Sequence, residues 1–176
     1  MATIDVAALN RQGKVFHAAN VSTKAFSVSA TVFTGLILFN PLGSGIKAVI
    51  IDWGLSYVTS PATINNSGLA VVNQTTTLPS STGTSTLNSA VALAADGSGK
   101  VGQVQPFDAA TLLTATVRRW TGGTAFGSAA GVSTYLGIDR VDGSLIIAPG
   151  VAVAVQTLTN ALVGAVASIT WAELPV

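Results

Sequence analysis

The chain has 176 residues, of which 49% are hydrophobic and only 9% are charged, and its formal net charge is +1. This near-neutral balance excludes the basic field on which binding along a nucleic-acid backbone depends. The lack of cysteine excludes disulfides and thiolate chemistry, and the length suits one domain with its own core.

The mean hydropathy of +0.60 raises the question of a membrane span. A spanning helix needs about 20 mostly apolar residues in a row. The two longest charge-free stretches, 53–95 and 143–172, are interrupted by proline and by amide and hydroxyl side chains. Residues 1–14 also lack the apolar block of a signal peptide. We therefore predict no membrane segment, and we assign the surplus apolar surface to contacts between protein chains. The alternative is a monomer whose surface is covered by Ser, Thr, Asn and Gly, which the sequence also supplies.

Short runs of β-branched and aromatic residues, bounded by turn-forming residues, follow one another along the chain and predict strands. In chain order, after one helical turn expected over 4–9, the predicted strands are 15–18, 25–29, 31–39, 46–58, 68–73, 87–94, 112–120, 133–138, 144–147, 151–156 and 165–173. Asp96-Gly97 and Asp142-Gly143 predict hairpin turns, and residues 75–86 and 121–131 predict loops. The pattern predicts an all-β fold: a single β-sandwich of the jelly-roll type over residues 18–176, preceded by an N-terminal arm over residues 1–17.

The sequence contains few residues that could support catalysis or bind a metal ion. His17 is the single histidine, and Asp139 with Asp142 is the only close pair of carboxylates. Two carboxylates fall short of a calcium cage, and the hairpin with Gly143 explains Asp142 better. No nucleophile elbow, phosphate loop or dinucleotide fingerprint is present. We therefore expect no enzyme, no metal and no cofactor.

The strongest surface signal is the run Arg118-Arg119-Trp120, which a glycine-rich segment follows. Arginine and tryptophan are over-represented among the residues that dominate protein interfaces, so the run is a candidate binding hot spot. In the alternative interpretation, Trp120 closes the end of the sandwich while Arg118 and Arg119 are solvated. The sequence leaves both interpretations open.

Four motifs give the chain a resemblance to a known family. They are Leu-Phe-Asn-Pro at 38–41, Asp-Gly-Ser at 142–144, Ala-Pro-Gly at 148–150 and Trp-Ala-Glu-Leu-Pro-Val at 171–176. On these motifs, residues 31–58 and 138–176 resemble the capsid cement (decoration) proteins of tailed bacteriophages, which are small jelly-roll proteins of the virion. Similar chains tend to carry a second acidic residue where this one has Ala172.

The resemblance implies a structural role on the phage head. It implies a homotrimer that binds the major capsid protein on the outer surface of the capsid, at the junctions between capsomers, and stabilises the shell. The alternatives are a jelly-roll tail-fibre or host-receptor protein that binds glycans, and a hydrolase with a jelly-roll core. A receptor protein calls for exposed aromatic side chains, for which Trp120 and Tyr135 are candidates, and a glycoside hydrolase calls for a pair of carboxylates in a cleft.

The arm is the predicted attachment element of such a trimer. We expect Ile4, Val6 and Leu9 to anchor it on a neighbouring subunit or on the capsid, with Arg11 and Lys14 contacting acidic groups. Three arms per trimer would then combine individually weak contacts. The alternative is that the three apolar side chains lie on the edge of their own sandwich, as chain termini often do.

Overall fold

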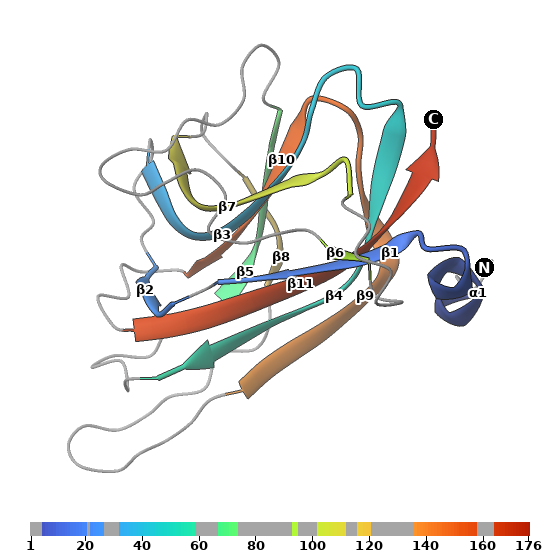
Figure 1. Ribbon diagram of the computed structural model, residues 1–176. Helices are drawn as coiled ribbons and strands as arrows, with labels where there is room; N and C mark the ends of the chain where they lie inside the picture. The colour runs from blue at the N-terminus through green and yellow to red at the C-terminus, as the bar shows by residue number, and fades with distance from the viewer. Residues whose placement is uncertain are drawn as a thin grey trace.

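Two antiparallel sheets pack face to face in the computed structural model of the protein (Figure 1). The structure describes residues 5–20, 22–26, 32–58, 67–73, 93–94, 102–111, 116–120, 136–157 and 164–176. The predicted all-β sandwich is confirmed, and the arrangement of its strands is consistent with a jelly roll. No helix in these ranges is long and apolar enough to cross a membrane.

The six-stranded sheet has the order β6-β1-β11-β4-β9, with β2 also paired to β11. Its strands are β1 (Val15–Ala19), β2 (Lys24–Ala25), β4 (Ile46–Tyr57), β6 (Leu93–Ala94), β9 (Leu136–Ile147) and β11 (Gly164–Pro175). The twelve-residue strands β4, β9 and β11 are its longest elements. Their length gives this sheet a broad outer face, turned away from the second sheet.

The five-stranded sheet has the order β7-β3-β10-β5-β8. Its strands are β3 (Val32–Asn40), β5 (Ser67–Asn73), β7 (Gln105–Thr111), β8 (Thr116–Trp120) and β10 (Val151–Thr157). The two apolar runs at 31–39 and 46–58, which the sequence predicts as strands, become β3 and β4 and lie in opposite sheets. The connection between them therefore passes over one end of the sandwich.

The main core lies between the two sheets. Trp53 and Trp171 are the largest fully buried side chains, and the Trp171 ring stacks on Phe16 with 6.0 Å between ring centroids. Leu36 and Leu38 join this core from β3, whereas Ile37 and Phe39 belong to a second buried cluster with side chains of β5, β7 and β10. Successive strand residues point to opposite faces, so β3 is buried on both. The uninterrupted apolar run of β3 is therefore buried by other residues of the same chain.

Two features of the strand pattern differ from the prediction. The prediction did not include β7, because Gln105, Pro106 and Asp108 interrupt the apolar pattern of this edge strand. Asp142-Gly143 does not form a hairpin, because β9 continues through it. Residues 141–144 lie opposite the single residue Ile51 of β4, and Asp142 and Gly143 have positive φ angles of 47° and 77°. The positive φ was expected, but it forms a bulge in a long strand rather than a turn.

Several predictions concern residues that lie outside the described ranges, and one concerns the N-terminal helix. The Asp96-Gly97 turn, the loops at 75–86 and 121–131, and most of the strand predicted over 87–94 lie outside the described residues. The predicted N-terminal turn over 4–9 corresponds to the helix α1 (Val6–Arg11). Asp5 is its N-cap, and its carboxylate accepts a hydrogen bond of 2.9 Å from the backbone N–H of Ala8.

Candidate interaction surface

The N-terminal arm packs on its own sandwich. Val6 and Leu9 of α1 contact a buried cluster formed by Val15, Ile51 and Ala172, on the outer face of the six-stranded sheet. For Val6 and Leu9, this packing matches the alternative in which the apolar side chains of the arm lie on their own sandwich. Ile4, the third of these side chains, lies outside the described residues. The predicted boundary at residue 17 falls inside β1, which pairs with β11 along its whole length. Contacts of the arm with a second subunit or with a capsid remain predictions.

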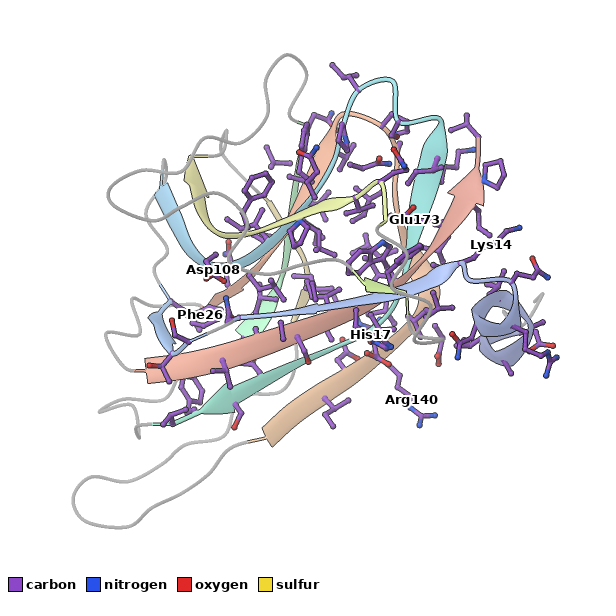
Figure 2. The ribbon with its side chains drawn as sticks, viewed as in Figure 1. Lys14, His17, Phe26, Asp108, Arg140 and Glu173 are labelled. Carbon is purple, nitrogen blue, oxygen red and sulfur yellow. The ribbon has the colours of Figure 1, made fainter. Side chains whose placement is uncertain are left out.

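The basic residues of the arm lie near the C-terminal strand. Arg11 is exposed and Lys14 is half-buried. The carbonyl oxygen of Lys14 accepts a hydrogen bond of 2.8 Å from the backbone N–H of Glu173, at the end of β11. Figure 2 shows Lys14 and α1 beside the same end of the six-stranded sheet. Both side chains are thus presented next to a fixed strand end.

Of the predicted hot spot, Arg119 has a structural role at the open edge of the sandwich. Its guanidinium forms an ion pair with Asp139 through Nε and Nη2, and Nη2 also donates to the carbonyl of Arg140 at 3.1 Å. Trp53 Nε1 donates to the same carboxylate at 3.1 Å. Because β8 and β9 belong to different sheets, Arg119 joins the two sheets. Arg118 and Trp120 lie in β8, but their side chains are outside the described part of the chain.

This ion pair makes stability depend on pH. The hydrogen bonds from Arg119 and from Trp53 hold the pKa of Asp139 below its ordinary value of 3.8, although partial burial acts in the opposite direction. A carboxylate whose folded pKa is lowered stabilises the fold above the unfolded pKa. That contribution is lost as the pH falls through the lowered folded pKa.

We expect Asp139→Asn to lower the free energy of unfolding at neutral pH by about 1–2 kcal/mol, since a two-point ion pair with a half-exposed arginine is lost. On acidification below about pH 4, the difference between the variant and the wild type should shrink towards zero. Urea unfolding measured across this pH range tests it. Asp142→Asn, at a neighbouring exposed carboxylate, is the matched control, and an equal loss in both variants would contradict the assignment.

The remaining polar candidates also have structural partners. His17 lies exposed on the outer face of the six-stranded sheet, with Nδ1 3.0 Å from the hydroxyl of Thr170. Ser144 donates to the carbonyl of Val141 at 2.8 Å and closes the bulge that contains Asp142. Within the described ranges, no three His, Cys, Asp or Glu side chains gather closely enough to hold a metal ion.

The turn between β3 and β4 is organised by one buried side chain, Asn40. Its amide group donates to the carbonyl of Ile46 at 2.9 Å and to the carbonyl of Ile147 at 3.0 Å, and its Oδ1 accepts from the hydroxyl of Ser44 at 2.7 Å. The Asn40 carbonyl accepts a further bond of 2.8 Å from the N–H of Gly150. Asn40 therefore connects the ends of three strands, β3, β4 and β9.

Three of the four motifs that carry the family resemblance meet at this end of the sandwich. The first is the strand end at Asn40, the second is the Ala-Pro-Gly turn that ends with Gly150, and the third is the end of β11. The N–H of Val176 donates to the carbonyl of Gly45 at 3.1 Å. Figure 1 shows the β3–β4 connection, the β9–β10 connection and the C-terminus at this same end. Motifs that are distant in the sequence thus form one surface.

We call this surface the Asn40 end; it comprises residues 40–46, 146–150 and 174–176. None of these residues has a charged side chain. Three of its aliphatic side chains are mostly exposed: Leu42 at 57%, Ile146 at 54% and Val176 at 71%. Exposed apolar groups on a hydrogen-bonded, charge-free support are typical of surfaces that bind another protein.

A second feature lies on the outer face of the six-stranded sheet. Ala19, Ser168, Gly54 and Ile138 stand side by side on β1, β11, β4 and β9. The small side chains leave a depression of about 390 Å³, which Ser56 and Val166 also line. We call it the trough. The neighbouring row is polar and consists of His17, Thr170, Asp52 and Arg140; Figure 2 shows His17 and Arg140 on this outer face.

Two buried polar groups had no counterpart in the sequence-based candidates. Glu173 is 9% exposed, and its carboxylate accepts hydrogen bonds from the N–H groups of Gln103 and Val104 and from the Trp171 indole. Asn20 donates to the buried carboxylate of Asp108 at 2.8 Å. Both contacts join segments more than sixty residues apart, a relation that no local motif indicates.

Comparisons with protein-family models, with curated proteins and with solved structures find no match to this chain. The resemblance to cement proteins therefore rests on the four motifs. The class that the structure defines is an all-β sandwich with an apolar end surface whose own side chains are uncharged.

Proposed function

We propose that the chain is a structural protein of the virion of a tailed phage: a cement (decoration) protein that binds the outer surface of the head as a homotrimer. Its partner is the major capsid protein. The observation that carries the proposal is the Asn40 end, because three of the four motifs of the resemblance meet there in a surface with uncharged side chains and with Leu42, Ile146 and Val176 exposed.

The physical chemistry of this surface suits permanent association. Obligate interfaces are more apolar than transient ones, and a surface held in place before binding loses little conformational entropy when it binds. The hydrogen bonds of Asn40 and Ser44 hold the turn in this way. Arg11 and Lys14 beside the end of β11 supply the basic groups for acidic positions on the shell.

Stabilisation of the shell then follows from mass action. A protein that binds only the assembled shell shifts the equilibrium towards that shell. A trimer that spans the junction between capsomers must dissociate, or release one capsomer, before the shell can open there.

The receptor-binding alternative calls for exposed aromatic rings beside polar groups. Trp53 and Trp171 are 1% and 0% exposed and belong to the core, whereas the side chains of its two candidates, Trp120 and Tyr135, lie outside the described part of the chain. The hydrolase alternative calls for a pair of carboxylates in a cleft. The two buried carboxylates of the described residues, Asp108 and Glu173, each accept a hydrogen bond that joins distant segments of the chain.

The test is to add the purified protein to genome-filled capsids that lack it. We expect saturable binding in multiples of three copies and release of the genome at a higher temperature than from undecorated capsids. Reversing the charge of the arm with Arg11→Glu and Lys14→Glu should weaken capsid binding while leaving the trimer intact. Absence of binding, or equal heat resistance with and without the protein, would remove the cement role.

A further inference from the structure

We propose that a bulge over residues 141–144 and the side chain of Arg119 keep the outer edge of β9 from pairing with β9 of a second copy. The edge of a sheet presents backbone N–H and C=O groups without a neighbouring strand, so it is a template for the strand of another chain. The inference concerns how this protein avoids such pairing, and it does not depend on the proposed function.

Strand β9 is the edge strand most open to this hazard. Among the described residues it pairs with β4 alone, and Figure 1 shows it as the outermost strand of its sheet. It has twelve residues, whereas the edge strands β6, β7 and β8 have two, seven and five. Because a longer edge offers a longer row of hydrogen bonds to a second chain, β9 has the greatest need of protection.

The overall charge of the chain gives little of this protection. Net charge keeps protein molecules apart, and this chain has a formal net charge of only +1. Its few charges gather on β9 instead: Asp139, Arg140 and Asp142 lie within four positions of a chain that has eight basic and seven acidic residues. Figure 2 shows Arg140 projecting from β9. Charged side chains on an edge strand oppose its pairing with another chain.

The bulge interrupts the edge near the middle of β9. Residues 141–144 lie opposite the single residue Ile51, and two of them have positive φ angles of 47° and 77°. The hydroxyl of Ser144 donates to the carbonyl of Val141 at 2.8 Å, which holds the bulge in shape. A bulge breaks the ladder and bends the strand, so the two halves of β9 do not present one straight row of groups to another strand.

Arg119 blocks the part of the edge beside the bulge. It comes from β8, in the other sheet, and its ion pair with Asp139 holds the guanidinium against β9. From there Nη2 donates to the carbonyl of Arg140 at 3.1 Å. We call these contacts the Arg119 clamp. A strand that paired along this part of β9 would have to displace a guanidinium bonded to a carboxylate, and such charge-assisted bonds are among the stronger ones in proteins.

The first test shortens the bulge. Deleting Asp142 and Gly143 removes two residues, so the side chains on either side keep their faces of the sheet. The deletion also removes both positive φ angles and one charge of the edge. We expect β9 strands of two copies to pair, and the molar mass measured by sedimentation to rise to at least twice that of the wild type at the same concentration.

A rescue and a control accompany the deletion. Ile138 is 65% exposed on β9, and Ile138→Lys adds a charge to the edge, so it should return the deletion variant to the wild-type mass. Glu173→Gln disturbs the buried hydrogen bonds of Gln103 and Val104, away from β9. It controls for a general loss of stability and should keep the wild-type mass.

A second variant tests the Arg119 clamp without shortening the chain. Arg119→Gln together with Asp139→Asn removes both charges of the ion pair, so neither is left without a partner. We expect the same rise in mass, but only at higher protein concentration than for the deletion, because the bulge remains. If circular dichroism shows that the deletion variant does not fold, this variant decides alone.

The outcomes are separate from those of the proposed function. A rise in mass that Ile138→Lys reverses, in either folded variant, supports the inference. The wild-type mass in every folded variant overturns it, and so does a rise that the lysine leaves unchanged or that Glu173→Gln shows equally. Capsid binding by the wild-type protein tests the cement role and is independent of each of these results.

Discussion

Asn40→Ala is expected to lower the free energy of unfolding by about 3–4 kcal/mol, one of the largest effects of any polar substitution in this protein. The side chain is fully buried, and its amide supplies the hydrogen bonds of the Ile46 and Ile147 carbonyls. A buried carbonyl left without a donor costs about 1–3 kcal/mol, and the loss of packing adds to this cost.

Two further variants show whether hydrogen bonding is the cause. Asn40→Asp keeps the size but replaces the donor with a carboxylate beside two carbonyl oxygens, so it should destabilise at least as much as alanine. Asn73→Ala, at an exposed asparagine that also ends a strand, should change stability by less than about 0.5 kcal/mol. Chemical denaturation measures all three. A small loss in Asn40→Ala would show that Asn40 does not hold the Asn40 end together.

Glu173→Gln is expected to cost about 2–4 kcal/mol, although it changes few atoms. The carboxylate accepts from three donors: Gln103 N–H and Val104 N–H at 3.0 Å each, and Trp171 Nε1 at 3.2 Å. A glutamine has one oxygen, so its NH₂ group would face at least one of these N–H donors. Hydrogen bonds to a charged acceptor are also stronger than those to a neutral one.

The segment that Glu173 holds also explains a glycine. A Cβ atom at Gly102 would lie only 2.5 Å from Glu173 Oε1, so the close approach of this segment to the carboxylate requires glycine. We expect Gly102→Ala and Glu173→Gln to be less than additive in unfolding experiments, because both disturb the same contact. Full additivity would mean that the two residues act independently.

The sequence predicted the sandwich because strand signals are local. Runs such as those that became β3, β4 and β10 contain β-branched and aromatic residues between turn formers, and each forms a strand within a residue or two of the expected bounds. The edge strand β7 was missed because Pro106 and Asp108 interrupt its pattern. The Asp142-Gly143 pair has the same positive φ in a bulge as in a turn, so sequence alone does not distinguish the two.

The surplus apolar sequence has two uses rather than one. The run from Leu36 to Phe39 is buried on both faces inside the chain, so it needs no partner subunit. Among the described residues, the large apolar side chains left exposed are Leu42, Ile146 and Val176 at the Asn40 end, and Val58 and Ile138 elsewhere. This distinction depends on which sheet each strand enters, and strand order is a long-range property that local patterns do not contain.

The candidate site could be predicted only in pieces. The motifs around Asn40, Gly150 and Val176 were visible as turns and strand ends, but their convergence required the pairing of β3 with β10 and of β4 with β11. Arg119 stood out as a possible binding residue, and its structural role became clear only from its contact with Asp139, twenty residues away on the other sheet.

The most direct test of the proposed function is an image of the phage particle in which this protein is labelled, for example with a bound antibody fragment. We predict three-lobed density on the outer surface of the head, at the junctions between capsomers, and its loss from particles that lack the protein. Density on the tail, or inside the shell, would contradict the cement role.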